Sequence, residues 1–366
     1  MKRTALIVCG IGLLAAFSGA EQMRTNPARP LHPHPDRTLK LTEVLRIPGE
    51  GEGYLLQGIR TLDLDAQGGI YVCDSWSSAQ KSHLLKFSPD SRFLKDLNRQ
   101  GEGPGEIQSM FDFAVGGPDV FLFDLMKRKI VVVNGQGGSR REFKKPDWDF
   151  NGFYGAWDRW LVFQRHVYPA ERKKTGLYDV PHKIVFLAKD GSAEKEVGIV
   201  TNREFYISMA QGGGGMSWDP FTAVLAGNRL YINSTQEYGI QILDLVSGKI
   251  VGSFKREFER IAHEPRKWEG EFISKYGAPK RKFERDITDL LFGEGLLWVE
   301  TAKPATEKTH HYDLFDGEGR YVDRVSLDFK GRLLKIDRGF LYAEILDAED
   351  LPSLVKYRID EPLGVR

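Results

Sequence analysis

Apolar and polar residues alternate with a period of two along short runs that recur through most of the chain. The clearest copy spans residues 59–97 and contains four such runs, at 59–65, 70–74, 84–87 and 92–97. Gly-Gly, Ser-Pro-Asp and other polar turns separate the runs. A period of two is typical of strands rather than of a helix, so this stretch predicts a four-stranded sheet.

Five further copies of the pattern follow. The second run of each copy starts with an apolar pair, and the six pairs are Ile70-Tyr71, Val120-Phe121, Trp160-Leu161, Leu230-Tyr231, Leu297-Trp298 and Leu341-Tyr342. The shorter intervals between pairs match one four-stranded blade, and the longer intervals contain insertions. One such sheet cannot bury both of its faces alone, whereas a ring of sheets can. The sequence therefore predicts an all-β fold, a six-bladed β-propeller.

The last copy has only three runs, at 333–337, 340–346 and 354–360, before the sequence ends. Residues 39–47 form an alternating run that precedes the first complete copy. We expect this N-terminal strand to complete the last blade, because that pairing leaves no open edge where the ring closes. The propeller is then expected over residues 39–366.

The N-terminal residues are typical of a targeting segment. Lys2 and Arg3 precede an apolar run over 5–17, and Ala20 ends a stretch of small residues. We predict a signal peptide over residues 1–20, which places the mature protein in the periplasm or outside the cell. Residues 21–38 contain four prolines and few apolar side chains, so they predict a disordered or extended leader.

Insertions are expected at 166–182, 201–219 and 255–286. The last of these is rich in charged residues and has aromatic residues at near-helical spacing. Pro265 suits the first turn of a helix and Gly277 suits its end, so we predict a short amphipathic helix over one face of the ring. Its excess of cations is compatible with an acidic ligand or with a solvated helix face.

Charge and cysteine content exclude several classes of function. The chain has 52 Lys and Arg against 51 Asp and Glu, and cleavage after Ala20 removes two of the cations. A nearly neutral mature chain gives no reason to expect nucleic-acid binding or attachment to a membrane surface. Cys73 would be its single thiol, and its apolar strand predicts a buried core residue.

Two stretches carry a family resemblance. Residues 65–74, Asp-Ala-Gln-Gly-Gly-Ile-Tyr-Val-Cys-Asp, resemble the core of the NHL repeat. Residues 97–106 end in Gly-Pro-Gly-Glu and resemble a signature of exported bacterial six-bladed propellers of the NHL and TolB-like kind. The resemblance implies the fold and export, and it assigns no activity.

The glycine-rich loops at 49–53 and 101–105 both lie ten residues before an inner strand. One interpretation is that they are turns chosen for backbone reach. The other is that the amides around Gly101 and Gly103 form an anion-binding concavity near the channel mouth, beside Arg60 or Arg99.

We therefore predict a binding or protein-interaction module that uses the channel mouth, with an envelope protein, an extracellular protein or a small ligand as its partner. The candidate ligand-binding side chains are those of Arg60, Arg99, Asp112, Asp219 and Asp286, which lie near predicted inner-strand starts. The alternative is a metal-dependent lactonase-like or lyase-like enzyme. The sequence shows no ligand set for such a metal, so no catalytic residue, metal site or cofactor is predicted.

Overall fold

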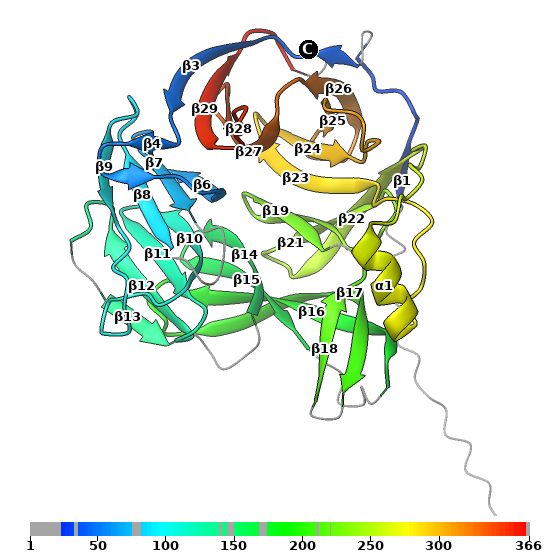
Figure 1. Ribbon diagram of the computed structural model, residues 1–366, viewed down its shortest axis with the longest axis horizontal. Helices are drawn as coiled ribbons and strands as arrows, with labels where there is room; N and C mark the ends of the chain where they lie inside the picture. Colours follow the sequence, from blue (N-terminus) through cyan, green and yellow to red (C-terminus); the bar gives the residue numbers. More distant parts are fainter. Residues whose placement is uncertain are drawn as a thin grey trace, which may run out of the picture.

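The structure is a computed structural model that describes residues 23–32, 36–74, 82–138, 141–144, 150–167, 174–209, 212–219 and 221–363. The predicted signal peptide over 1–20 lies outside these residues. Six sheets, built mainly of antiparallel strands, surround a common centre, and the chain is a six-bladed β-propeller, as predicted (Figure 1).

The first three blades follow one another along the chain. Blade 1 consists of β6 (Ile59–Leu64), β7 (Ile70–Asp74), β8 (His83–Phe87) and β9 (Phe93–Asp96). Blade 2 consists of β10 (Met110–Gly116), β11 (Asp119–Asp124), β12 (Lys129–Asn134) and β13 (Arg141–Lys144). Blade 3 has five strands, β14 (Phe150–Trp157), β15 (Trp160–His166), β16 (Gly176–Ala188), β17 (Glu194–Met209) and β18 (Gly212–Ser217).

The other three blades each include a strand from the N-terminal segment. Blade 4 contains β19 (Thr222–Ala226), β20 (Arg229–Asn233), β21 (Ile240–Asp244), β22 (Lys249–Arg256) and β1 (Arg24–Asn26). Blade 5 contains β23 (Ile287–Gly293), β24 (Leu296–Thr301), β25 (His310–Phe315), β26 (Tyr321–Leu327) and β2 (Arg37–Thr38). Blade 6 contains β27 (Gly331–Asp337), β28 (Phe340–Leu346), β29 (Pro352–Ile359) and β3 (Leu41–Ile47).

The predicted closure of the ring is confirmed. β3 pairs antiparallel with β29, with Ile47 opposite Leu354 and Leu41 opposite Ile359. A small hairpin of β4 (Glu50–Gly51) and β5 (Tyr54–Leu55) then leads into blade 1. An N-terminal strand and the C-terminal strands thus share one sheet.

The segment 21–38, which the sequence predicted to be disordered or extended, contains two short strands. β1 adds a parallel strand to β22, and β2 adds a parallel strand to β26. The side chain of Asn26 links β1 to blade 5: its Nδ2 donates to the Gly319 carbonyl at 2.9 Å, and its Oδ1 accepts from the Tyr321 amide at 3.1 Å. These parts of the leader are extended because the outer strands of blades 4 and 5 supply the backbone partners that a disordered chain lacks.

The core lies between the blades. Six apolar clusters each join two neighbouring sheets, because each sheet is apolar on both faces. The cluster between blades 6 and 1 includes Ile47, Leu354, Ile59 and Val72. Cys73 is buried in the cluster between blades 1 and 2, as predicted.

The strands β6, β10, β14, β19, β23 and β27 form the innermost layer, and each contacts the next around the centre (Figure 1). The loops that enter these strands all lie on one face of the ring. We call it the entry face, and it carries the insertion at 255–286.

We expect the substitution Ile47→Ala to lower the free energy of unfolding by about 2–5 kcal/mol, because it opens a cavity in the cluster that closes the ring. Urea-induced unfolding followed by tryptophan fluorescence measures the change. Val44→Ala on the exposed side of the same strand is the matched control and should change the stability by less than about 0.5 kcal/mol. Equal effects of the two substitutions would contradict this account of closure.

Candidate functional site

The insertion at 255–286 contains the helix α1 (Lys267–Tyr276). Glu269 in its first turn accepts a hydrogen bond from the Arg266 amide at 2.9 Å. Gly277 ends the helix with φ 68°, the left-handed conformation that glycine adopts without strain. Pro265 precedes the helix instead of forming its first turn. Of the residues that the structure describes, no helix is long and apolar enough to cross a membrane.

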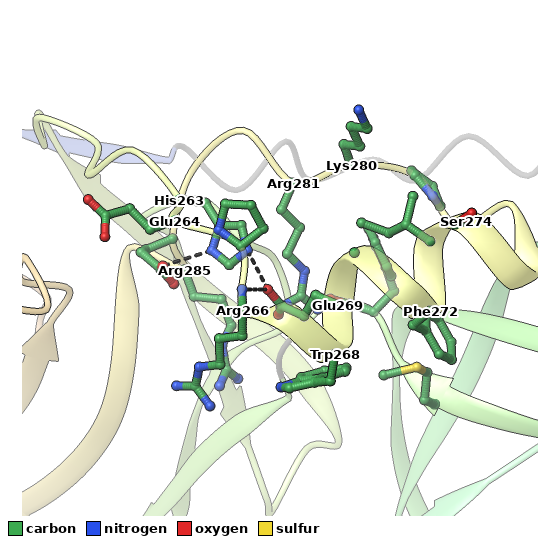
Figure 2. A pocket seen from close by; sticks show the side chains of 17 residues that line it. His263, Glu264, Arg266, Trp268, Glu269, Phe272, Ser274, Lys280, Arg281 and Arg285 are labelled. Atoms are coloured by element: carbon green, nitrogen blue, oxygen red, sulfur yellow. Dashed lines mark hydrogen bonds and ion pairs between the residues drawn. The ribbon is translucent and has the colours of Figure 1, made fainter.

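A histidine fixes α1 to the rest of the insertion. The ring of His263 contacts Glu269 through Nε2 at 2.9 Å and Glu284 through Nδ1 at 2.7 Å (Figure 2). Glu269 belongs to the helix, and Glu284 to the segment that returns to blade 5. The two contacts therefore hold the start of the helix against the returning segment.

The apolar side of α1 packs on the part of blade 3 that extends beyond an ordinary blade. Phe272 lies 5.9 Å from Phe205 of β17 between ring centroids, and Phe205 lies 6.1 Å from Trp218. Met216 of β18 joins the same cluster. The predicted insertion at 201–219 thus consists of the second half of β17 and the short strand β18, which together support the helix.

A cavity of about 730 Å³ lies between α1, the β18 end of blade 3 and the returning segment (Figure 2). Trp218, Trp268 and Phe272 form apolar parts of its wall, and Arg281 and Arg285 form a cationic part. This volume falls within the range of small-molecule sites, and such sites combine apolar walls with a few placed polar groups.

Arg281 and Arg285 are neighbouring cations that form no ion pair with a carboxylate of the described residues. Within the described residues, no Asp or Glu oxygen lies within 4.0 Å of either guanidinium. Arg281 lies 4.8 Å from the Trp218 ring, and its Nε is buried without a hydrogen-bond partner among the described residues. Partial burial lowers the pKa of Arg285, and the nearby charge of Arg281 makes a smaller contribution in the same direction. Glu284 partly offsets this effect on Arg285, and Glu269 interacts with the charge of Arg281. The two guanidinium groups therefore form a cationic part of a wall that also contains carboxylates outside ion-pair distance.

Arg285 also borders two neighbouring cavities on the entry face. One, of about 540 Å³, lies against blade 5 and shares Glu264, Arg266 and Glu284 with the first cavity. The other, of about 350 Å³, lies between blades 3 and 4 and shares Trp218 and Arg281 with it. The two arginines thus lie where these hollows meet.

The cavity between blades 3 and 4 contains a cluster that the sequence analysis did not identify. His166, His182 and Glu204 each offer a ligand atom, and these atoms all lie within 4.8 Å of one another. Burial lowers the pKa of His182 to about 3, with a smaller contribution from His166 in the same direction. The His182 ring is therefore neutral at physiological pH.

Arg60 lines a separate cavity of about 870 Å³ between blades 6 and 1. Its guanidinium lies 4.3 Å from the centre of the Phe111 ring. Arg332 and Glu344 from blade 6 border the same cavity and form an ion pair at 2.9 Å. Arg60 therefore lies at the start of an inner strand on the entry face, where the sequence placed it.

Asp112 lies on the inner strand β10. Its Oδ1 accepts hydrogen bonds from Thr61 Oγ1 at 2.9 Å and from the Phe113 amide at 2.8 Å. Burial raises the pKa of Asp112 to about 6 despite these hydrogen bonds. Asp289 on β23 occupies a similar position, and burial raises its pKa to about 6 as well. The inner layer thus holds two carboxyl groups that titrate close to neutral pH.

The other two predicted acidic residues are held in ion pairs. Asp219 is buried and accepts from Arg203 Nε at 2.6 Å, and it also borders the cavity between blades 3 and 4. Asp286 accepts from Arg260 Nε at 2.9 Å and from the Tyr238 amide at 2.9 Å. Burial raises the pKa of Asp286. Both carboxylates hold entry-face loops in place.

The glycine loop presents its amides to carboxylates of the protein itself. The Gly103 amide donates to Glu106 at 2.9 Å, and the Gly105 amide donates to Glu142 at 2.7 Å. Gly101 donates its amide to the Ile107 carbonyl, and the side chain of Arg99 is exposed. The loop has the geometry of an anion site, but internal carboxylates occupy it.

Comparison with known proteins supports the fold. Residues 51–212 match a family described as a 6-bladed beta-propeller. A candidate exported protein from Bacteroides fragilis has a similar structure, with a TM-score of 0.56, 13% identity, and coverage of 93% of this chain and 100% of that one. A member of the DUF4221 family from Bacteroides vulgatus has a TM-score of 0.55 and 12% identity, with coverage of 88% and 98%. No curated protein matches the sequence. The likeness to NHL and TolB-like propellers stays a prediction.

We expect Asp112→Asn to stabilise the protein at neutral pH but not in mild acid. A raised pKa means that the folded state retains a proton that the unfolded chain releases. The contribution of this carboxyl to stability therefore falls as the pH rises from about 4 to about 6. The uncharged amide removes this loss, so the variant should gain about 1–3 kcal/mol over the wild type between pH 4.5 and pH 7.5.

Urea-induced unfolding at the two pH values measures this gain. Asp328→Asn on the exposed surface is the matched control, and its effect should be the same at both pH values. A pH-independent effect of Asp112→Asn would contradict the raised pKa.

Proposed function

We propose that this protein is an exported binding protein and that its ligand is a small amphipathic anion held between α1 and blade 3. The observation that carries the proposal is the pair Arg281 and Arg285. Among the described residues they lack carboxylate partners, and they lie where a cavity lined by Trp218 and Trp268 meets its neighbours.

The chemistry of the walls supports this class of ligand. Two guanidinium groups present planar arrays of donors that fit a carboxylate, sulfonate or phosphate. The indole rings present flat apolar surfaces that would cover a hydrocarbon or aromatic body. An anion would also offset the mutual repulsion of the two cations, so its binding would relieve an unfavourable interaction of the free protein.

The position of the site refines the prediction made from the sequence. The channel mouth was predicted, and its candidate side chains were those of Arg60, Arg99, Asp112, Asp219 and Asp286. The cavity under α1 is on the same entry face, but other cations line it, and Asp219 and Asp286 hold the loops around it. We therefore place the ligand site beside the insertion, away from the centre of the ring.

Export is supported by the N-terminal sequence and by the name of the similar structure from Bacteroides fragilis. Expression of the full chain in a bacterium with a periplasm should yield a mature protein that begins at Glu21. Intact-mass measurement of the periplasmic fraction tests this. Recovery of the uncleaved chain from the cytoplasm alone would contradict export.

The ligand proposal can be tested with 8-anilinonaphthalene-1-sulfonate, a fluorescent probe with one sulfonate and an aromatic body. We expect one saturable site per chain. Arg285→Ala should weaken binding by about 10–100-fold, because a charge-assisted hydrogen bond of about 1.5–3 kcal/mol is lost. Arg285→Lys keeps the charge and should retain part of the affinity.

The matched control is Lys282→Ala, which removes a nearby exposed cation that does not line the cavity. Its affinity for the probe should equal that of the wild type. The proposal fails if the wild type shows no saturable site, or if Arg285→Ala and Lys282→Ala bind equally well.

A further inference from the structure

The sheet of blade 3 brings three potential metal ligands to one place. His166 of β15 lies opposite His182 of β16 in the strand register, so the two rings share one face of the sheet. Val200 of β17 lies opposite His182, and Glu204 is four residues further along the strand on the same face. His182 and Glu204 are fully buried, and His166 is nearly so.

The distances between the ligand atoms suit a metal ion. Glu204 Oε1 lies 3.2 Å from His166 Nδ1 and 3.8 Å from His182 Nε2. Bonds of about 2.0–2.2 Å in a tetrahedral site place neighbouring ligand atoms about 3.3 Å apart. An ion can therefore bind among the three side chains with small adjustments of their rotamers.

One buried atom of the cluster lacks a hydrogen-bond partner among the described residues. His182 Nε2 has no hydrogen-bond partner within the described part of the chain, although it points into the cluster with Glu204. A buried imidazole nitrogen without a partner is unfavourable, and native proteins rarely leave such a group unsatisfied. A hydrogen bond between His166 and Glu204 alone does not resolve this, because it leaves His182 Nε2 unpaired.

The surroundings of His182 suit a ligating histidine. The amide of Gln164 lies between Tyr154 Oη and His182 Nδ1. In the structure Tyr154 Oη donates to Gln164 Oε1, and Gln164 Nε2 faces His182 Nδ1. Rotation of the amide by about 180° turns its oxygen toward Nδ1, so that it accepts the Nδ1 proton and leaves the Nε2 lone pair for a metal, while Tyr154 Oη accepts from the amide nitrogen. The Phe221 ring stacks on the imidazole at 4.9 Å and fixes its plane.

We propose that His166, His182 and Glu204 bind a divalent first-row transition ion, for which Zn²⁺ is the reference. Two histidines and one carboxylate leave at least one coordination position open, and the cavity of about 350 Å³ lies next to it. This site stands independently of the proposed function, since it uses none of the residues that carry that proposal.

Metal binding by the mature protein tests the site. After removal of metals with a chelator, the wild type should take up one Zn²⁺ per chain in equilibrium dialysis. Co²⁺ should produce visible absorption bands typical of nitrogen and oxygen ligands. Glu204→Gln and His182→Ala should abolish stoichiometric binding, and Gln164→Ala should weaken it by about 10–100-fold.

His310→Ala in blade 5 is the matched control, because His310 also contacts a glutamate, Glu300 at 2.6 Å. It should leave metal binding unchanged. Glu204→Gln preserves the shape of the side chain, so it decides the outcome even if His182→Ala fails to fold. The proposal is overturned if the wild type takes up neither ion, or if Glu204→Gln binds as the wild type does. Binding of the sulfonate probe is scored separately, so either proposal can fail alone.

Discussion

The constraint on which the rest of the structure depends is that every blade must cover both of its faces with neighbouring blades. A four-stranded sheet with alternating apolar residues exposes too much apolar surface to exist alone, and only a closed circle gives every sheet two neighbours. The front of the chain meets this constraint by supplying β3 to blade 6. β1 and β2 extend the same solution, because they cover the outer edges of blades 4 and 5 with further strands.

Buried Asp313 shows how the propeller stabilises a structural charge. Asp313 is fully buried, yet Arg256, Tyr238 and Tyr321 donate to its two oxygens at 2.6–2.8 Å. A charge buried without such partners would cost several kcal/mol. Where the protein has a structural charge, it therefore surrounds that charge with partners. Other buried side-chain atoms, such as Arg256 Nη2 and Arg324 Nε, also lack a hydrogen-bond partner among the described residues. Those of Arg281 and His182 belong to residues that border the cavities of the entry face.

The sequence predicts the fold far better than the site. The alternation of apolar and polar residues in strands and the residues of turns are local signals. The six sheets, the apolar pair of each sheet and the closing strand could therefore be identified from the sequence alone. The site depends on contacts between distant segments. His166, His182 and Glu204 come together only through the pairing of β15, β16 and β17. All three residues lie in segments that the sequence analysis assigned to insertions. The excess of cations at 255–286 was the available signal for Arg281 and Arg285, but it is equally typical of a solvated helix.

The two sets of exceptional groups have a physical connection. A divalent ion bound by His166, His182 and Glu204 would have a net charge of about +1 with its ligands, because only the glutamate is charged. Arg281 and Arg285 border the same cavity, so the metal would increase the positive potential that they create. An anion that reached the open coordination position would then interact with the ion and with the arginines at once. The formal charge of the whole chain is close to zero, and a sum over the whole chain gives no indication of such a local field.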